Sequence, residues 1–291
     1  MSCSFETVTV IGAGTMGAGI AQVCAQAGAQ VVLNDIGDEQ VERGFATIRR
    51  FLDKGIEKGK VTPELREATL GRLRPATDLA ESVRDAQLVI EAVPESVELK
   101  QSVFERAGAA VADDAVLATN TSSLSLAEVF AGVPGPQRCI GTHFFNPVPI
   151  MALLEIVRMA TTDGAVVDRV RAFAGELGKE PIVVHDSPGF ATSRLGVCLG
   201  LEAIRMLEAG VASAADIDKA MELGYRHPMG PLRLTDLVGL DVRLAIAEYL
   251  SSELDSPAFA VPQLLRDKVA AGKVGKKAGE GFYEWPDSPA R

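Results

Sequence analysis

Short apolar runs alternate with longer amphipathic stretches from residue 5 to about residue 186, and this pattern predicts an α/β fold. The apolar runs are rich in Val, Ile and Leu, as expected of strands in a sheet. They occupy residues 5–11, 30–35, 72–78, 86–95, 115–123, 138–143, 153–157 and 181–185, in some cases with the following loop. Strands that alternate with helices imply a mainly parallel sheet, whose ligands bind beyond the carboxyl ends of its strands.

The pattern changes at residues 186–189, which read Asp-Ser-Pro-Gly. Beyond them the periodicity is helical throughout, and the predicted helical stretches are residues 190–210, 213–224, 231–254 and 261–272. We therefore expect two domains, residues 1–186 and an all-helical domain of residues 187–291. The helix at 190–210 is apolar on nearly all sides, which predicts burial between domains or between subunits and hence a homodimer formed through the helical domain.

The first apolar run leads directly into a glycine-rich turn, Gly12-Ala13-Gly14-Thr15-Met16-Gly17, and then into a helical stretch. The next apolar run ends in Asp35. In such a unit the first glycine makes the tight turn, the second lets the backbone approach a pyrophosphate, and the third lets helix and strand pack closely. Asp35 is placed to accept hydrogen bonds from the adenosine ribose and to repel a 2′-phosphate. The sequence therefore predicts a Rossmann-type domain that binds NAD in preference to NADP.

Residues 38–72 interrupt the plain alternation with two polar helices, and Thr62-Pro63-Glu64 reads as the start of the second. This helical excursion carries a basic cluster made of Arg49, Arg50, Lys54, Lys58 and Lys60. The cluster is either a solvated helix face or a clamp for an anionic small ligand.

The stretch at 141–157 offers one imidazole and one carboxylate to the same place. His143 ends one predicted strand, a Pro-rich turn follows, and Glu155 lies within the next predicted strand. His is suited to proton transfer near neutral pH, and a carboxylate on its other nitrogen fixes the tautomer and stabilises the imidazolium. The alternative is a capped His at a strand end and an unrelated Glu that reaches solvent.

Four further polar residues follow predicted strands and are therefore candidates by position. They are Glu95, Lys100, Asn120 and Ser122. The structural alternatives are loop capping for Asn120 and Ser122, a first-turn Glu at 95, and a solvent-facing Lys at 100.

Composition narrows the class of protein. The 291 residues are 47% hydrophobic and carry a net charge of −10, which indicates a compact folded chain and argues against a nucleic-acid or membrane partner. The four cysteines are scattered without CxxC or metal-like spacing; they are Cys3, Cys24, Cys139 and Cys198. We expect reduced thiols and no metal site. The apolar opening lacks a basic leader, so we expect no targeting segment and a cytoplasmic enzyme.

Along essentially its whole length, the chain resembles the L-3-hydroxyacyl-CoA dehydrogenase family in its short, single-function bacterial form. The motifs that carry the resemblance are VIGAGTMGAGIAQVCAQAG, TNTSSL, GTHFFNPVPIMALLEIV, DSPGF, HPMGPLRLTDLVGLD and GKKAGEGFY. The resemblance implies reversible NAD-dependent oxidation of a (3S)-3-hydroxyacyl-CoA, such as 3-hydroxybutyryl-CoA, to the 3-ketoacyl-CoA, as in fatty acid β-oxidation.

The resemblance also implies roles for individual residues. His143 becomes the catalytic base, Glu155 its orienting carboxylate, and Ser122 a hydrogen-bond donor to the substrate oxygen. The implied NAD site consists of Gly12, Ala13, Gly14, Thr15, Met16, Gly17, Asp35, Glu95, Lys100, Ser122, Asn146 and Lys277. The implied substrate contacts are Ser122, Asn146, Lys54 and Lys58, the lysines toward coenzyme A.

Two positions depart from the family pattern. Ser193 replaces the usual Asn of the PGFxxNR motif, which helps to position substrate, and Phe51 replaces a Ser found in some members near the coenzyme A nucleotide. These departures leave other interpretations open. They are a 3-hydroxyadipyl-CoA dehydrogenase, with Ser193 and Arg194 near the distal carboxylate, a sugar-acid dehydrogenase of the gulonate type, and a non-catalytic NAD-binding protein.

Overall fold

The computed structural model describes residues 3–286. The chain divides into two compact units, Met1–Ser187 and Pro188–Arg291. Among the described residues no helix has the length and apolarity needed to cross a membrane.

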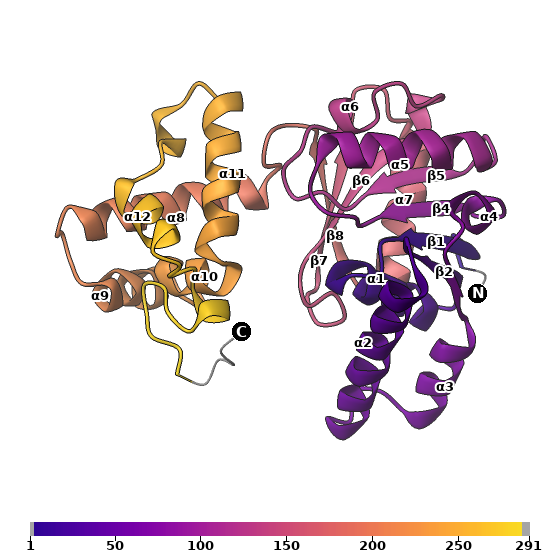
Figure 1. Ribbon diagram of the computed structural model, residues 1–291, viewed down its shortest axis with the longest axis horizontal. Coiled ribbons are helices and arrows are strands. Elements are labelled where there is room, and N and C mark those ends of the chain that lie inside the picture. The colour runs from indigo at the N-terminus through magenta and orange to yellow at the C-terminus, as the bar shows by residue number, and fades with distance from the viewer. Residues whose placement is uncertain (1–2, 287–291) are drawn as a thin grey trace. The chain divides into compact units, whose positions relative to one another are not determined.

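An eight-stranded sheet forms the centre of the first unit (Figure 1). Its strands are β1 (Thr7–Ile11), β2 (Gln30–Asn34), β3 (Leu73–Ala76), β4 (Leu88–Glu91), β5 (Val116–Thr119), β6 (Cys139–Phe144), β7 (Leu153–Arg158) and β8 (Glu180–His185). The strand order is β3-β2-β1-β4-β5-β6-β7-β8, and only the β6–β7 pair is antiparallel. The predicted mainly parallel sheet is therefore confirmed. The strand order reverses between β1 and β4, and such a switch point is where open α/β sheets bind their ligands.

Helices cover both faces of this sheet. They are α1 (Thr15–Gln26), α2 (Asp38–Glu57), α3 (Pro63–Gly71), α4 (Leu79–Val83), α5 (Val97–Ala110), α6 (Leu126–Val129) and α7 (Gly164–Glu176). α1 and α7 share one hydrophobic core with the strands, whereas α5 lies on the opposite face, over β4 and β5 (Figure 1). The predicted start of α3 is correct, because the Thr62 hydroxyl accepts a hydrogen bond from the Leu65 amide and Pro63 occupies the first turn.

The second unit is helical, as predicted, and consists of α8 (Thr192–Glu208), α9 (Ala214–Lys219), α10 (Pro231–Val238), α11 (Leu240–Glu253) and α12 (Gln263–Ala270). The single stretch expected at 231–254 is two helices. Gly239 adopts a φ of 105°, which only glycine reaches readily, and it ends α10 and precedes α11. The buried face of α8 packs into the core of this unit through Val197, Leu201 and Ile204.

A buried carboxylate anchors the last described segment to the second unit. Asp236 accepts hydrogen bonds from the Phe282 amide at 2.8 Å, the Tyr283 amide at 2.9 Å and the Trp285 indole at 2.9 Å. Lys277 precedes this anchored segment, in the 3-10 turn Lys276–Ala278.

Candidate active site

The three glycines of the turn after β1 differ in how much space surrounds their Cα atoms. Gly12 has a φ of 101°, and a Cβ there would lie 2.7 Å from the Ala92 carbonyl oxygen. A Cβ on Gly17 would lie 1.7 Å from the Gly12 carbonyl oxygen, so no other residue fits this contact between turn and helix. A Cβ on Gly14 would meet nothing within 4 Å. The turn is therefore tight on its inner side and open above the N-terminus of α1.

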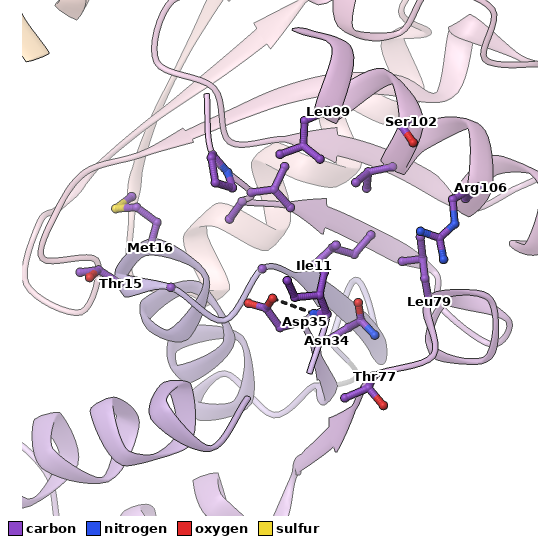
Figure 2. A pocket seen from close by; sticks show the side chains of 17 residues that line it. Ile11, Thr15, Met16, Asn34, Asp35, Thr77, Leu79, Leu99, Ser102 and Arg106 are labelled. Atoms are coloured by element: carbon purple, nitrogen blue, oxygen red, sulfur yellow. Dashed lines mark hydrogen bonds between the residues drawn. The ribbon is translucent and has the colours of Figure 1, made fainter. Parts of the chain in front are cut away.

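Asp35 holds this turn from the end of β2. Its Oδ2 accepts a hydrogen bond from the Ala13 amide at 2.7 Å, and its Oδ1 accepts one from the Ile36 amide at 2.7 Å. The carboxylate borders a pocket of about 740 Å³ that also includes Gly12, Gly14, Thr15 and Met16. Figure 2 shows Asp35 in the middle of this pocket, between Met16 and Arg106.

The far wall of the pocket comes from one face of α5, which was not predicted from the sequence. Leu99, Ser102, Val103 and Arg106 line it (Figure 2). Counted from Leu99, the other three residues follow by three, four and seven positions, the spacing that brings side chains to one helix face. That spacing is the feature of the sequence from which this wall could have been predicted.

These features fit an NAD dinucleotide. The open space over Gly14 lies where backbone amides of the first turn of α1 face outward without a side-chain cap, which suits a pyrophosphate. The Asp35 carboxylate is fixed by two amides and retains lone pairs for ribose hydroxyls. The pocket beyond it offers apolar walls for a base.

His143 and Glu155 lie directly opposite each other on the antiparallel strands β6 and β7. Their side chains are 7% and 0% exposed, and His143 Nδ1 lies 2.7 Å from Glu155 Oε2. Opposed residues of an antiparallel pair share one face of the sheet, so the topology itself brings the two groups together. The alternative in which Glu155 reaches solvent is wrong.

Two neighbours hold the end of β6 beside the imidazole. The side-chain oxygen of Asn120, at the end of β5, accepts a hydrogen bond from the Phe144 amide at 2.9 Å. The Phe145 ring lies 4.4 Å from the His143 ring, centroid to centroid. Asn120 thus ties β5 to the residue after His143 rather than capping its own loop.

A buried lysine organises the ends of β4 and β5. Lys100 is fully buried, and its Nζ lies 2.7 Å from Glu91 Oε1 and 3.4 Å from Glu95 Oε2. The other Glu95 oxygen accepts hydrogen bonds from the Ser122 amide at 2.9 Å and the Thr121 hydroxyl at 2.6 Å. The solvent-facing alternative for Lys100 is wrong, and its full burial places it behind Glu95 rather than at the surface of the pocket. Glu91 was not predicted, because it ends an apolar run without a motif of its own, and Thr121 was not singled out although it lies in the TNTSSL motif.

The loop between β6 and β7 is fastened by another buried lysine. Lys179 Nζ donates hydrogen bonds to the Val148 carbonyl at 2.5 Å and the Met151 carbonyl at 2.7 Å. Its burial lowers its pKa. Asn146 is exposed at the start of this loop, and its peptide bond to Pro147 is cis.

The basic cluster lies along the second half of α2 and just beyond its end, where Lys58 and Lys60 follow the helix. Arg49, Arg50 and Lys54 line a surface groove of about 630 Å³, and Lys58 is exposed at the end of the helix. Phe51 is half-buried, with the Arg50 guanidinium 6.0 Å from its ring centroid. The groove is rich in cations but also includes the carboxylates of Asp53 and Glu57.

Two candidates belong to the second unit. Ser193 lies in the first turn of α8. Lys277 Nζ lies 2.6 Å from Asp241 Oδ2, and the two side chains are 40% and 43% exposed, respectively. In the part of the chain that the structure describes, no three His, Cys, Asp or Glu side chains gather as metal ligands would.

Comparison with known proteins gives consistent matches over both units. Residues 7–187 match the family model described as 3-hydroxyacyl-CoA dehydrogenase, NAD binding domain. Residues 189–285 match the model described as 3-hydroxyacyl-CoA dehydrogenase, C-terminal domain.

Individual relatives extend these matches. The 3-hydroxybutyryl-CoA dehydrogenase of Mycobacterium tuberculosis is 45% identical over 98% of this chain and 100% of its own length. The 3-hydroxyadipyl-CoA dehydrogenase of Escherichia coli is 40% identical over 98% of this chain and 60% of its own length. The crystal structure of (S)-3-hydroxybutyryl-CoA dehydrogenase from Ralstonia eutropha is 41% identical, covers 97% of this chain and 99% of that chain, and superposes with a TM-score of 0.93.

Proposed function

The chain belongs to the 3-hydroxyacyl-CoA dehydrogenase family of NAD-dependent enzymes, and from this premise we propose that it interconverts (3S)-3-hydroxybutyryl-CoA and acetoacetyl-CoA with His143 as the general base. The observation that carries the proposal is the buried pair in which His143 Nδ1 lies 2.7 Å from Glu155 Oε2. An imidazole held in this way presents its second nitrogen to a substrate hydroxyl.

The proton transfer follows from this arrangement. In the oxidative direction His143 takes the proton of the 3-hydroxyl group through Nε2 while Glu155, bound at Nδ1, fixes the tautomer and stabilises the imidazolium that forms. Bound NAD supplies the hydride-accepting chemistry. In the reverse direction the imidazolium returns the proton to the substrate oxygen. Ser122 donates a hydrogen bond to that oxygen and keeps it aligned with His143.

The proposed cofactor contacts start from the pocket beside the glycine turn. The turn from Gly12 to Gly17 cradles the pyrophosphate and Asp35 binds the adenosine ribose. Glu95, Asn146 and Lys277 are assigned to the cofactor by the family pattern, and Lys100 acts through Glu95 because it is fully buried.

The coenzyme A end of the substrate is assigned to the basic face of α2. Lys54 and Lys58 are exposed there and suit the phosphates of coenzyme A. This cationic face supports an acyl-CoA substrate over a free sugar acid, which has no second anionic group to engage it.

A homodimer formed through the helical unit and a cytoplasmic location complete the proposal. Large apolar side chains of this unit support the dimer, since Leu195 is 71% exposed and Leu223 and Tyr225 are each 76% exposed. Free thiols at all four cysteines, two of them buried, support a reducing compartment. Light scattering at micromolar concentration tests the dimer, and a monomeric mass would contradict it.

A 3-hydroxyadipyl-CoA substrate is the second candidate, because the Escherichia coli enzyme with that name is 40% identical. Ser193 stands where the family has a longer Asn, and Arg194 beside it is exposed and offers a cation for a distal carboxylate. The two candidates differ only in the acyl chain, so one assay separates them.

The test is loss of NADH absorbance with purified protein and acetoacetyl-CoA. Free acetoacetate tests whether turnover requires the coenzyme A end of the substrate, and NADPH tests whether Asp35 excludes a 2′-phosphate. 3-Oxoadipyl-CoA tests the second candidate substrate. Rapid turnover of acetoacetyl-CoA with NADH alone is the expected result. Demonstrable NADH binding without turnover of acetoacetyl-CoA would overturn the proposed substrate.

A further inference from the structure

Glu91, the last residue of β4, is fully buried and makes three contacts with its carboxylate. Oε1 accepts hydrogen bonds from Lys100 Nζ at 2.7 Å and the Val93 amide at 2.7 Å. Oε2 accepts a hydrogen bond from the Thr119 hydroxyl at 2.6 Å. Thr119 is the register partner of Glu91 on the neighbouring strand β5, so the carboxylate joins the ends of two adjacent strands.

The contacts continue from Glu91 to Ser122. Lys100 Nζ, fixed by Glu91, lies 3.4 Å from Glu95 Oε2. Glu95 Oε1 in turn accepts the Ser122 amide at 2.9 Å. A continuous chain of charged contacts therefore runs from the buried end of β4 to the backbone of the loop after β5.

Burial decides which member of this chain sets the positions of the others. Glu91 and Lys100 have no exposed side-chain surface, whereas the Glu95 side chain is 38% exposed. An exposed ion pair gains little and leaves its side chains several rotamers, but a buried ammonium must keep its counter-charge close. Glu91 therefore fixes Lys100, and Lys100 restricts Glu95 to the rotamer that reaches Ser122.

We propose that Glu91 is a positioning residue for the dehydrogenase reaction, acting through Lys100 and Glu95 to hold the backbone of Ser122 where its hydroxyl meets the substrate oxygen. This inference rests on the proposed function, because it takes Ser122 as a substrate contact. A purely stabilising Glu91 would instead support the sheet and leave the Ser122 amide as it is.

The first test needs neither cofactor nor substrate. Amide hydrogen exchange at Ser122, followed by NMR on the cofactor-free protein, reports the hydrogen bond to Glu95 directly. In Glu91→Gln we expect Ser122 exchange to rise by about tenfold or more, as expected for the loss of a hydrogen bond to a charged group. The matched control is Thr9→Val, which removes another buried contact of the same sheet, from the Thr9 hydroxyl to the Ser82 carbonyl at 2.5 Å. It should leave Ser122 exchange unchanged.

The second test is a double-mutant cycle on kcat/KM for acetoacetyl-CoA reduction. Glu91→Gln should lower kcat/KM by about 10- to 100-fold in the parent chain, the effect typical of residues that orient a functional group. In a Ser122→Ala background the same change should lower it by less than about threefold, because coupled residues are not additive. Thr9→Val should leave the parent kcat/KM as it is.

The outcomes separate the two proposals. Equal effects of Glu91→Gln in both backgrounds, or unchanged Ser122 exchange, would overturn the positioning role while leaving His143 as base. A parent chain that does not turn over acetoacetyl-CoA would overturn the proposed function, and the exchange measurement would still decide whether Glu91 holds Ser122. If Glu91→Gln does not fold, Glu91→Asp, which keeps the charge but draws the carboxylate back from Lys100 Nζ, replaces it in both tests with the same criteria.

Discussion

His143 and Glu155 are register partners on antiparallel strands, and the imidazole Nδ1 lies 2.7 Å from the carboxylate Oε2. The carboxylate is fully buried, so its interaction with the imidazole is weakly screened by solvent. Strand register thus places the imidazole beside Glu155, and the contact at Nδ1 fixes which ring nitrogen faces the carboxylate.

This relationship predicts unequal effects at the two positions. His143→Gln should lower kcat by about 10²- to 10⁴-fold, the usual contribution of a general base. Glu155→Gln keeps a hydrogen-bond acceptor but removes the charge, so we expect a smaller loss. The double variant should be little worse than His143→Gln, because the two residues act as a unit. Steady-state kinetics with unchanged circular dichroism spectra measure these effects, and near-normal turnover in His143→Gln would contradict the base assignment.

The glycine turn predicts a contrast between two substitutions that look alike in the sequence. Gly14→Ala should fold normally, because its Cβ meets nothing within 4 Å, yet its methyl group would occupy the space assigned to the pyrophosphate. Gly17→Ala should destabilise the protein, because its Cβ would lie 1.7 Å from a backbone oxygen.

We therefore expect Gly14→Ala to raise the Kd for NADH by about tenfold or more at an unchanged Tm, and Gly17→Ala to lower the Tm by several degrees. Fluorescence titration and thermal unfolding measure the two quantities. Unchanged NADH affinity in Gly14→Ala would contradict the placement of the pyrophosphate over Gly14.

Asp35 predicts cofactor preference. Its carboxylate is fixed by the Ala13 and Ile36 amides, so it cannot easily turn away from a 2′-phosphate. Asp35→Asn keeps the acceptor toward Ala13 and removes the charge. We expect the ratio of kcat/KM for NADH over NADPH to fall by about tenfold or more, since like charges at contact cost several kcal/mol. A ratio that stays constant would show that another residue excludes the phosphate.

The sequence predicted the strands and the meeting of His143 with Glu155, but not the buried Glu91–Lys100 pair. Apolar runs and glycine turns follow local rules, so β1 to β8 and the start of α3 were predictable. The five-residue helix α4 was missed because it is too short for a periodic signal. The Glu91–Lys100 pair was missed because pairing of two charges nine positions apart depends on where β4 meets α5. The split of residues 231–254 depends on the φ of Gly239, which composition alone does not reveal.

The Asp241–Lys277 pair predicts a dependence of stability on pH. Burial tends to raise the pKa of Asp241, but hydrogen bonds from Lys277 and backbone amides outweigh it and hold that pKa below its ordinary value of 3.8. A carboxyl whose pKa is lower in the folded state stabilises the fold above its unfolded pKa and loses this contribution as the pH falls through the folded pKa.

Asp241→Asn should therefore lower the Tm by a few degrees near pH 7, and the difference from the parent should vanish as the pH drops below the ordinary Asp value. Asp255→Asn, which removes the same charge at an exposed position, is the control. Thermal unfolding across the acid range tests this. A Tm difference that persists at the lowest pH would mean that packing, not the charge, accounts for the effect.

Ser193 is a position at which the chain departs from its family pattern, and it leads to a prediction about the preferred acyl chain. The usual Asn carries a carboxamide where Ser193 carries a hydroxyl, so its side chain reaches further from the first turn of α8. Ser193→Asn should restore the longer side chain and shift preference toward the short acetoacetyl chain. We expect the ratio of kcat/KM for acetoacetyl-CoA over 3-oxoadipyl-CoA to rise by about tenfold, within the range that one buried group contributes to discrimination. Glu202→Gln, an exposed change later on the same helix, should leave the ratio constant. If Ser193→Asn also leaves it constant, chain length is selected elsewhere, and Ser193 is neutral toward the acyl group.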